Sequence, residues 1–169
     1  MHLTSSYGMK LTGDFGALEN SIRIYRQALS VLIPIINNDW ETVNQCRYSN
    51  QKVNLIEKWI HSTKSNQAIF DFDEIFPKLP TYLRRSAIAK ALGIVSSYRS
   101  NLENWEQNRK GQAPKLSLTH YAYPAYYKGN LFRNFDPIRQ TIELKVFKNG
   151  DWVYEVYQLK TSDCTYYLT

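Results

Sequence analysis

The feature that most constrains the fold is a long amphipathic segment at residues 77–111, which joins an apolar stripe to a set of positive charges. Apolar residues recur there at steps of three and four, the spacing that places side chains on one face of an α-helix. Pro80 suits the first position of such a helix, and Gly111 with Pro114 is expected to end it. The apolar stripe comprises Leu83, Ala87, Ala91, Ile94, Tyr98, Leu102 and Trp105, with Tyr98 and Trp105 assigned to the core.

The chain before this segment also has a helical pattern. Asp14 is expected to cap a helix with an apolar stripe, and the missing backbone donor of Pro34 should kink or end that helix. Continuation for a turn or two into residues 35–43 is the alternative. A second helix is expected at about residues 49–62. Gly93 costs the central helix about 1 kcal/mol relative to alanine, so one continuous helix and two helices broken there both remain open.

The last third of the chain changes to aromatic and β-branched residues separated by Pro, Gly and Asn. Asn149 and Gly150 join two runs of strand-forming residues, a pair that predicts a tight hairpin turn. In that register Phe147 faces Trp152 across the hairpin. A short strand within residues 7–12 could join the same sheet, for which we expect three to five strands.

Composition limits the class of protein. The chain is 43% hydrophobic and 21% charged, which is typical of a globular protein. The longest apolar stretch, residues 28–36, is far shorter than the roughly 20 residues that cross a bilayer. We therefore expect no membrane association, and the absence of a signal-peptide pattern at the first residues favours the cytoplasm.

Patterns for metal binding and catalysis are missing from the sequence. Cys46 and Cys164 lie 118 positions apart without a CxxC pair, and the three histidines are scattered, so we expect free thiols and no zinc site. The acidic group at residues 71–74 is better interpreted as the start of a short helix than as a cation site. No nucleophile, base and orienting group stand at a recognisable spacing, which leaves a small hydrolase without support. We expect no cofactor.

The net charge of +6 is concentrated in one part of the chain. Residues 84–139 hold ten Lys and Arg against three Asp and Glu, whereas the residues before them balance and those after them have a net charge of −1. A concentrated positive charge is typical of a surface that binds a polyanion. A plain solvated basic face is the alternative.

Three stretches in this order, residues 19–33, 76–98 and 123–156, resemble the N-terminal part of the TnpB-like, OrfB-family transposon-encoded proteins, which are RNA-guided DNA endonucleases related to type V CRISPR effectors. The resemblance implies an α+β fold in which a helical bundle, the recognition lobe, is inserted into a small antiparallel oligonucleotide-binding-type β-barrel or sheet. It implies a first strand in residues 1–13, a helical lobe at 14–111 and a wedge-type β unit at 112–169.

The same resemblance implies guide RNA and target DNA as partners, a role in transposition, and association with the bacterial nucleoid when DNA is bound. The family's RuvC-like carboxylates and four-cysteine zinc element have no counterpart here. Whether these 169 residues are a domain cut from a longer protein or a truncated relative, we expect them not to cleave DNA. The missing C-terminal nuclease lobe of the same protein is expected as a further partner.

The candidate binding residues are basic and aromatic. Cations would neutralise phosphates and tyrosines would stack on bases or pack against ribose; for each, a solvated surface position or a half-buried sheet position is the alternative. A protein-interaction module that uses an aromatic sheet face is the second hypothesis. The candidates are Arg84, Arg85, Lys90, Arg99, Arg109, Lys110, Lys115, Lys128 and Arg133, with Tyr126, Tyr127 and Phe132 for stacking.

Overall fold

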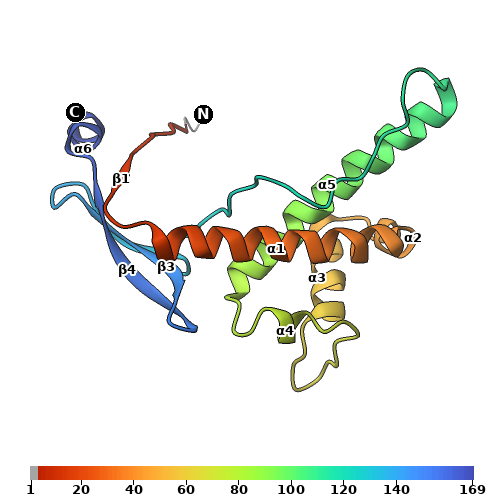
Figure 1. Cartoon of the computed structure of the whole chain (residues 1–169), viewed down its shortest axis with the longest axis horizontal. Coiled ribbons are helices and arrows are strands. Elements are labelled where there is room, and N and C mark those ends of the chain that lie inside the picture. The colour runs from red at the N-terminus through yellow and green to blue at the C-terminus, as the bar shows by residue number, and fades with distance from the viewer. Residues whose placement is uncertain (1–3) are drawn as a thin grey trace. The chain divides into compact units, whose positions relative to one another are not determined.

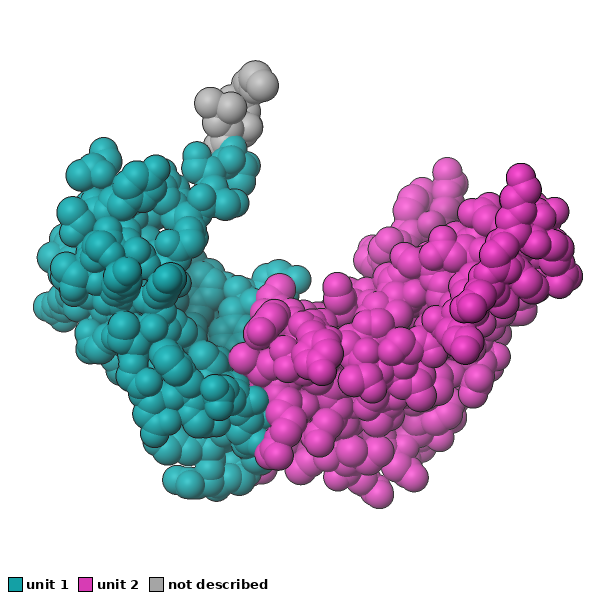
Figure 2. Space-filling model, turned by 45° about the horizontal axis from the view of Figure 1, so that its top comes forward, with its two compact units in different colours: residues 1–21, 126–169 teal, residues 22–125 magenta. Residues whose placement is uncertain are grey.

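The computed structural model describes residues 4–169, which hold six helices and a four-stranded antiparallel sheet in two compact units (Figures 1 and 2). The predicted α+β class is confirmed. We call residues 22–125 the helical unit and residues 4–21 with 126–169 the sheet unit. The chain passes between the units within the first helix and at residue 125, and not at the expected 13/14 and 111/112 boundaries. Residues 1–3, where the expected first β segment begins, lie outside the described residues.

The first helix starts where the capping pattern predicts. The Oδ1 atom of Asp14 accepts the N–H of Gly16 at 2.9 Å, which satisfies one of the free donors of the first turn. The helix continues past Pro34, because Ile33 and Ile36 are fully buried and their packing offsets the lost backbone hydrogen bond. The helices up to the sheet are α1 (Gly16–Asn38), α2 (Trp40–Gln45), α3 (Ser49–Ile60), α4 (Phe72–Ile75) and α5 (Thr81–Asn108).

The central helix α5 is continuous through Gly93, where an added Cβ would meet no atom within 4 Å. Its buried face is shorter than the predicted stripe: burial ends at Val95, and Tyr98 and Trp105 are only half-buried, so their assignment to the core is wrong. The N-terminal half of α5 packs against α3, whereas its C-terminal half is covered by residues 109–125, an irregular segment that folds back along it and is called the returning segment (Figure 1). No helix in the described part of the chain is both long and apolar enough to cross a membrane.

The sheet has the strand order β1-β4-β3-β2 and is open, so a closed barrel is not formed. Leu11 of β1 pairs with Leu159 of β4, which brings the N-terminal segment into the sheet as predicted. The hairpin turn has positive φ at both Asn149 (52°) and Gly150 (79°), the geometry that this residue pair favours. The strands and the last helix are β1 (Leu11–Thr12), β2 (Phe132–Asp136), β3 (Thr141–Lys148), β4 (Asp151–Leu159) and α6 (Thr161–Leu168).

One face of the sheet packs against the first turns of α1. Leu144, Val146 and Tyr157 are buried there, and the ring of Phe15 lies parallel to that of Tyr157 with centroids 6.4 Å apart. The hydroxyl of Ser21 accepts the N–H of Phe147 at 2.7 Å. The predicted cross-strand pair of Phe147 with Trp152 is confirmed, with ring centroids 5.4 Å apart.

Candidate nucleic-acid interface

The two units differ in charge. The helical unit holds 14 Lys and Arg against 8 Asp and Glu, a net charge of +6, and the sheet unit holds seven of each. The whole positive excess of the chain therefore belongs to the helical unit. A surface that attracts a polyanion is best sought there.

Two of the predicted cations, Arg84 and Arg85, are bound internally. Arg84 is only 5% exposed, and its Nε and Nη2 atoms lie 3.1 and 3.0 Å from Oε1 of Glu57 on α3. Arg85 forms an ion pair with the other oxygen of Glu57 and donates to the side chain of Asn54 at 2.9 Å. One carboxylate thus joins two guanidinium groups and holds α3 against α5. Arg84 is not available to a ligand.

Arg99 is also occupied within the fold. Its Nη2 atom donates to the backbone carbonyl of Asn37 at 2.6 Å, and its Nε atom donates to the side-chain oxygen of the same residue at 2.9 Å. The carbonyls in the last turn of α1 lack partners within the helix, and a cation there is favoured by the helix dipole. Arg99 therefore caps α1.

The end of α5 presents two cations of different character. Arg109 ends the helix in the left-handed conformation (φ 51°), with its guanidinium 4.7 Å from the ring centroid of Trp105. Lys110, the next residue, is exposed and makes no hydrogen bond or ion pair with any residue between 4 and 169. Lys110 is a cation that can bind a phosphate without breaking an existing contact.

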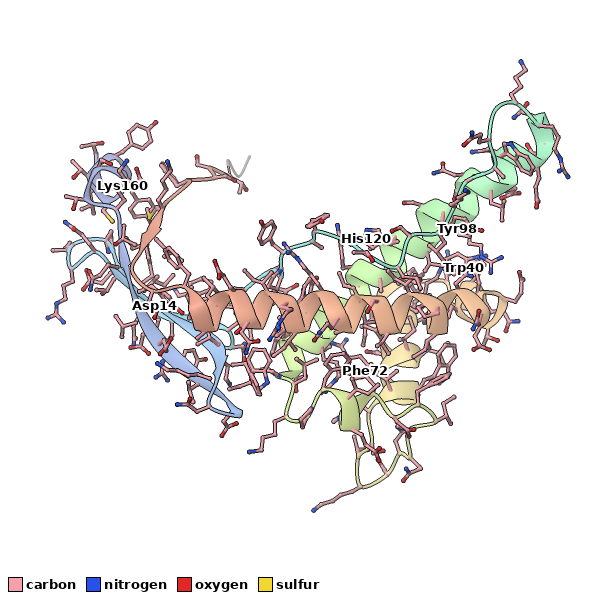
Figure 3. The ribbon with its side chains drawn as sticks, viewed as in Figure 1. Asp14, Trp40, Phe72, Tyr98, His120 and Lys160 are labelled. Carbon is pink, nitrogen blue, oxygen red and sulfur yellow. The ribbon has the colours of Figure 1, made fainter. Side chains whose placement is uncertain are left out.

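A groove of about 560 Å³ lies between α5 and the segment that folds back along it. We call it the α5 groove. Lys90 on α5 and Lys115 on the returning segment line it and are exposed, and neither has an ion-pair partner among the residues that the structure describes. Figure 3 labels Tyr98 on α5 and His120 on the returning segment, which line the same groove. Two unpaired cations and two flat rings are thus brought to one concave surface.

Sequence reasoning missed an aromatic cluster just beyond this groove. Tyr121 and Tyr123 are 85% and 72% exposed. The guanidinium carbon of Arg26, on α1, lies 5.5 and 4.9 Å from the centroids of their rings, and its Nε atom donates to the backbone carbonyl of Ala122 at 3.0 Å. The signal in the sequence is the alternation Tyr-Ala-Tyr in a segment without helical periodicity, but its arginine lies 95 positions earlier in the chain than Tyr121.

The predicted tyrosines of the sheet unit have unequal exposure. Tyr126 packs against the sheet core, donates its hydroxyl to the carbonyl of Lys145 at 2.7 Å, and has its pKa raised by burial and then by the nearby Tyr157. Phe132 packs against the same core. Tyr127 is 49% exposed. Tyr126 and Phe132 are half-buried by this packing and are therefore less accessible to a base than Tyr127.

The predicted cations of the sheet unit are Lys128 and Arg133. Lys128 is exposed and its side chain has no partner within residues 4–169. Arg133 forms a 2.6 Å ion pair with Glu143 and lies 3.8 Å from the ring centroid of Tyr154. Hydrogen bonds from Asn134 and Arg133 to the carboxylate hold the pKa of Glu143 below its usual range. The charge of Arg133 is thus largely balanced within the sheet.

Within the described residues, no group of three or more His, Cys, Asp and Glu is placed to hold a metal ion. In the acidic group at residues 71–74, Asp73 instead accepts from Nδ1 of His61 at 2.9 Å and from the backbone N–H of Ser62 at 3.1 Å. This carboxylate ties the loop after α3 to α4. Cys46 and Cys164 are free, as predicted.

The fold and surface define an α+β protein with a basic helical unit and an open antiparallel sheet. The chain belongs to the Aq_aa04 family, whose model matches residues 5–148. A curated relative from Aquifex aeolicus (strain VF5), described as uncharacterized protein aq_aa04, is 35% identical over 89 residues, which cover 51% of this chain and 47% of the relative. The match thus spans about half the length of that relative. No solved structure matches the chain.

Proposed function

We propose that this chain is a nucleic-acid-binding module that acts in the cytoplasm and that its helical unit carries the interface. The observation that carries the proposal is the location of the charge: the helical unit has the entire net charge of +6, and three of its exposed lysines, Lys90, Lys110 and Lys115, have no partner among the described residues. Unpaired lysines release counterions when they meet phosphates, which is the main source of affinity for a polyanion. Paired arginines such as Arg84 cannot contribute in this way.

Binding is tested by fluorescence anisotropy with labelled RNA and DNA at 50 and 200 mM salt. A single strand whose phosphates meet these three lysines should bind about 20-fold more weakly at the higher salt concentration. The variant Lys90→Ala/Lys115→Ala should weaken binding at low salt. The control Lys58→Ala/Lys64→Ala removes the same charge from exposed positions of the same unit outside the α5 groove and should bind nearly as well as the wild type. Absence of binding to RNA and DNA at 50 mM salt would refute the proposal.

We further propose that the module serves a transposon-encoded, RNA-guided nuclease of the TnpB-like type and does not itself cleave DNA. The support is the sequence resemblance, together with the insertion of helices α2 to α5 between two strands, β1 and β4, that pair with each other. Translating the DNA downstream of the codon for Thr169 tests this context. Spaced carboxylates and paired CxxC motifs are expected there or in a neighbouring gene, and their absence from both would contradict the nuclease context without affecting the binding proposal.

A protein-binding sheet face is the second candidate. On β3 and β4, side chains that alternate with the buried ones include Phe147, Trp152 and Val156, the last of which is 63% exposed. Lys145 and Glu143 lie on the same face, but its aromatic and aliphatic side chains fit a protein partner better than a phosphate backbone. The substitution Val156→Asp should abolish such an association without altering the binding of RNA or DNA.

A further inference from the structure

We propose that Tyr121 and Tyr123, held by Arg26, form a stacking site for the unpaired bases of a single-stranded nucleic acid. This inference deepens the proposed function and rests on it, since it specifies which form of nucleic acid the helical unit binds. The ligand class is a single strand of RNA or DNA, because only unpaired bases expose their faces to a side chain.

The first argument is the exposure of both rings. Tyr121 and Tyr123 are two positions apart, and the centroids of both rings lie within 5.5 Å of the guanidinium carbon of Arg26, so the rings are presented on the same side of the chain. At 85% and 72% exposure they contribute little to the core of the helical unit. Tyr7, by contrast, is also exposed but packs edge-on against Tyr167 with ring centroids 5.0 Å apart.

The second argument is that the cluster is organised before a ligand arrives. The Nε atom of Arg26 is bonded to the carbonyl of Ala122, the residue between the two tyrosines, which fixes the segment against α1. Arg26 forms no ion pair within residues 4–169, so its charge is not neutralised by a carboxylate. The guanidinium of Arg26 can therefore bind a phosphate while the rings of Tyr121 and Tyr123 stack on the adjoining bases.

The third argument is continuity with the unpaired lysines. The segment that presents the two tyrosines also lines the α5 groove with Lys115 and His120, and Lys90 faces it from α5. A positively charged groove followed by exposed rings is the combination that single-strand-binding proteins use, with cations along the backbone and aromatic rings against the bases. Charge complementarity thus favours a single strand as the occupant over an uncharged protein surface.

The test compares Tyr121→Leu/Tyr123→Leu with the wild-type chain, using a labelled single-stranded RNA, the DNA of the same sequence, and the DNA duplex. Loss of both rings should weaken binding of the single strands at least about 10-fold, leave their salt slope unchanged, and leave duplex binding unaltered. Tyr121→Phe/Tyr123→Phe keeps the rings and should bind single strands nearly as well as the wild type. Comparing the RNA and DNA arms determines which single strand is preferred.

The matched control is Tyr48→Leu. Tyr48 is 54% exposed and has the guanidinium of Arg47 5.2 Å from its ring centroid, yet it lies at the start of α3, outside the α5 groove. The variant Tyr48→Leu should bind the single strands and the duplex as well as the wild type does. The stacking site would be overturned if Tyr48→Leu or Tyr121→Phe/Tyr123→Phe lost as much single-strand affinity as the double leucine variant. It would also be overturned if the double leucine variant lost as much affinity for the duplex as for single strands. If the wild type binds single strands and the leucine variant binds as well, only the stacking site fails. If the wild type binds no oligonucleotide, both proposals fail and a protein partner becomes the occupant.

Discussion

Arg84 of α5 and Glu57 of α3 form a buried ion pair, with Nη2 and Oε1 3.0 Å apart. Removing one partner of such a pair leaves a poorly compensated charge inside the fold. Arg84→Ala should therefore lower the free energy of unfolding by about 3 kcal/mol, the lower end of the usual range because Arg85 still neutralises Glu57.

Urea denaturation measures this effect. Lys90→Ala, at an exposed and unpaired position of the same helix, should change the free energy of unfolding by less than about 0.5 kcal/mol. A stability loss in Lys90→Ala as large as that in Arg84→Ala would contradict the assignment of the two residues to structure and surface.

Gly93 lies in the interior of α5, where its backbone has helical geometry and a Cβ would meet no atom within 4 Å. Gly93→Ala should raise the free energy of unfolding by about 0.5–1 kcal/mol, because alanine restricts the unfolded chain more than glycine does. Thermal and urea denaturation would each detect the gain. A loss of stability would show that the helix needs the glycine.

The glycine of the hairpin should respond in the opposite direction. Gly150 has φ of 79°, a conformation that costs an L-residue about 1–2 kcal/mol. Gly150→Ala should lower the free energy of unfolding by about that amount, while leaving the binding of RNA and DNA unchanged because the turn belongs to the sheet unit. Unchanged stability on denaturation would argue against a left-handed residue at this position.

The stability of the sheet unit should fall at high pH. Burial, with the nearby Glu155 second, raises the pKa of Tyr157 to about 12 from the usual value of about 10. A tyrosine whose pKa is raised by folding contributes stability that is fully present below about pH 10 and is lost as the pH rises through about 12.

Urea denaturation between pH 9 and 12 tests this dependence in the wild type and in Tyr157→Phe. The free energy of unfolding should decline less steeply in Tyr157→Phe above pH 10, by up to about 1.4 kcal/mol per pH unit. Parallel curves for the two proteins would mean that Tyr157 ionises at the same pH whether folded or unfolded.

The elements that could be predicted from the sequence are those specified by neighbouring residues. The cap at Asp14, the turn at Asn149 and Gly150, and the pairing of Phe147 with Trp152 each depend on a short segment. The extent of the buried face of α5 could not be predicted in the same way, because it depends on where α3 packs.

Which basic side chains are paired within the fold could not be predicted from the sequence either. The sequence identified the basic segment, but Arg84 is neutralised by a residue 27 positions earlier and Arg99 caps a carbonyl 62 positions earlier. Those partners are fixed only when the helices pack. The tyrosine cluster was missed for the same reason, since Arg26 and Tyr123 meet only in the folded helical unit.

The salt dependence of oligonucleotide binding tests the central claim most directly. We expect log Kobs for a single strand to fall with log salt concentration, and the slope to shrink by about 1.4 in Lys90→Ala/Lys115→Ala, since each phosphate contact contributes about 0.7. In the charge-matched Lys58→Ala/Lys64→Ala protein the slope should equal that of the wild type. Equal slopes in all three proteins would contradict the claim that the α5 groove contacts the phosphates.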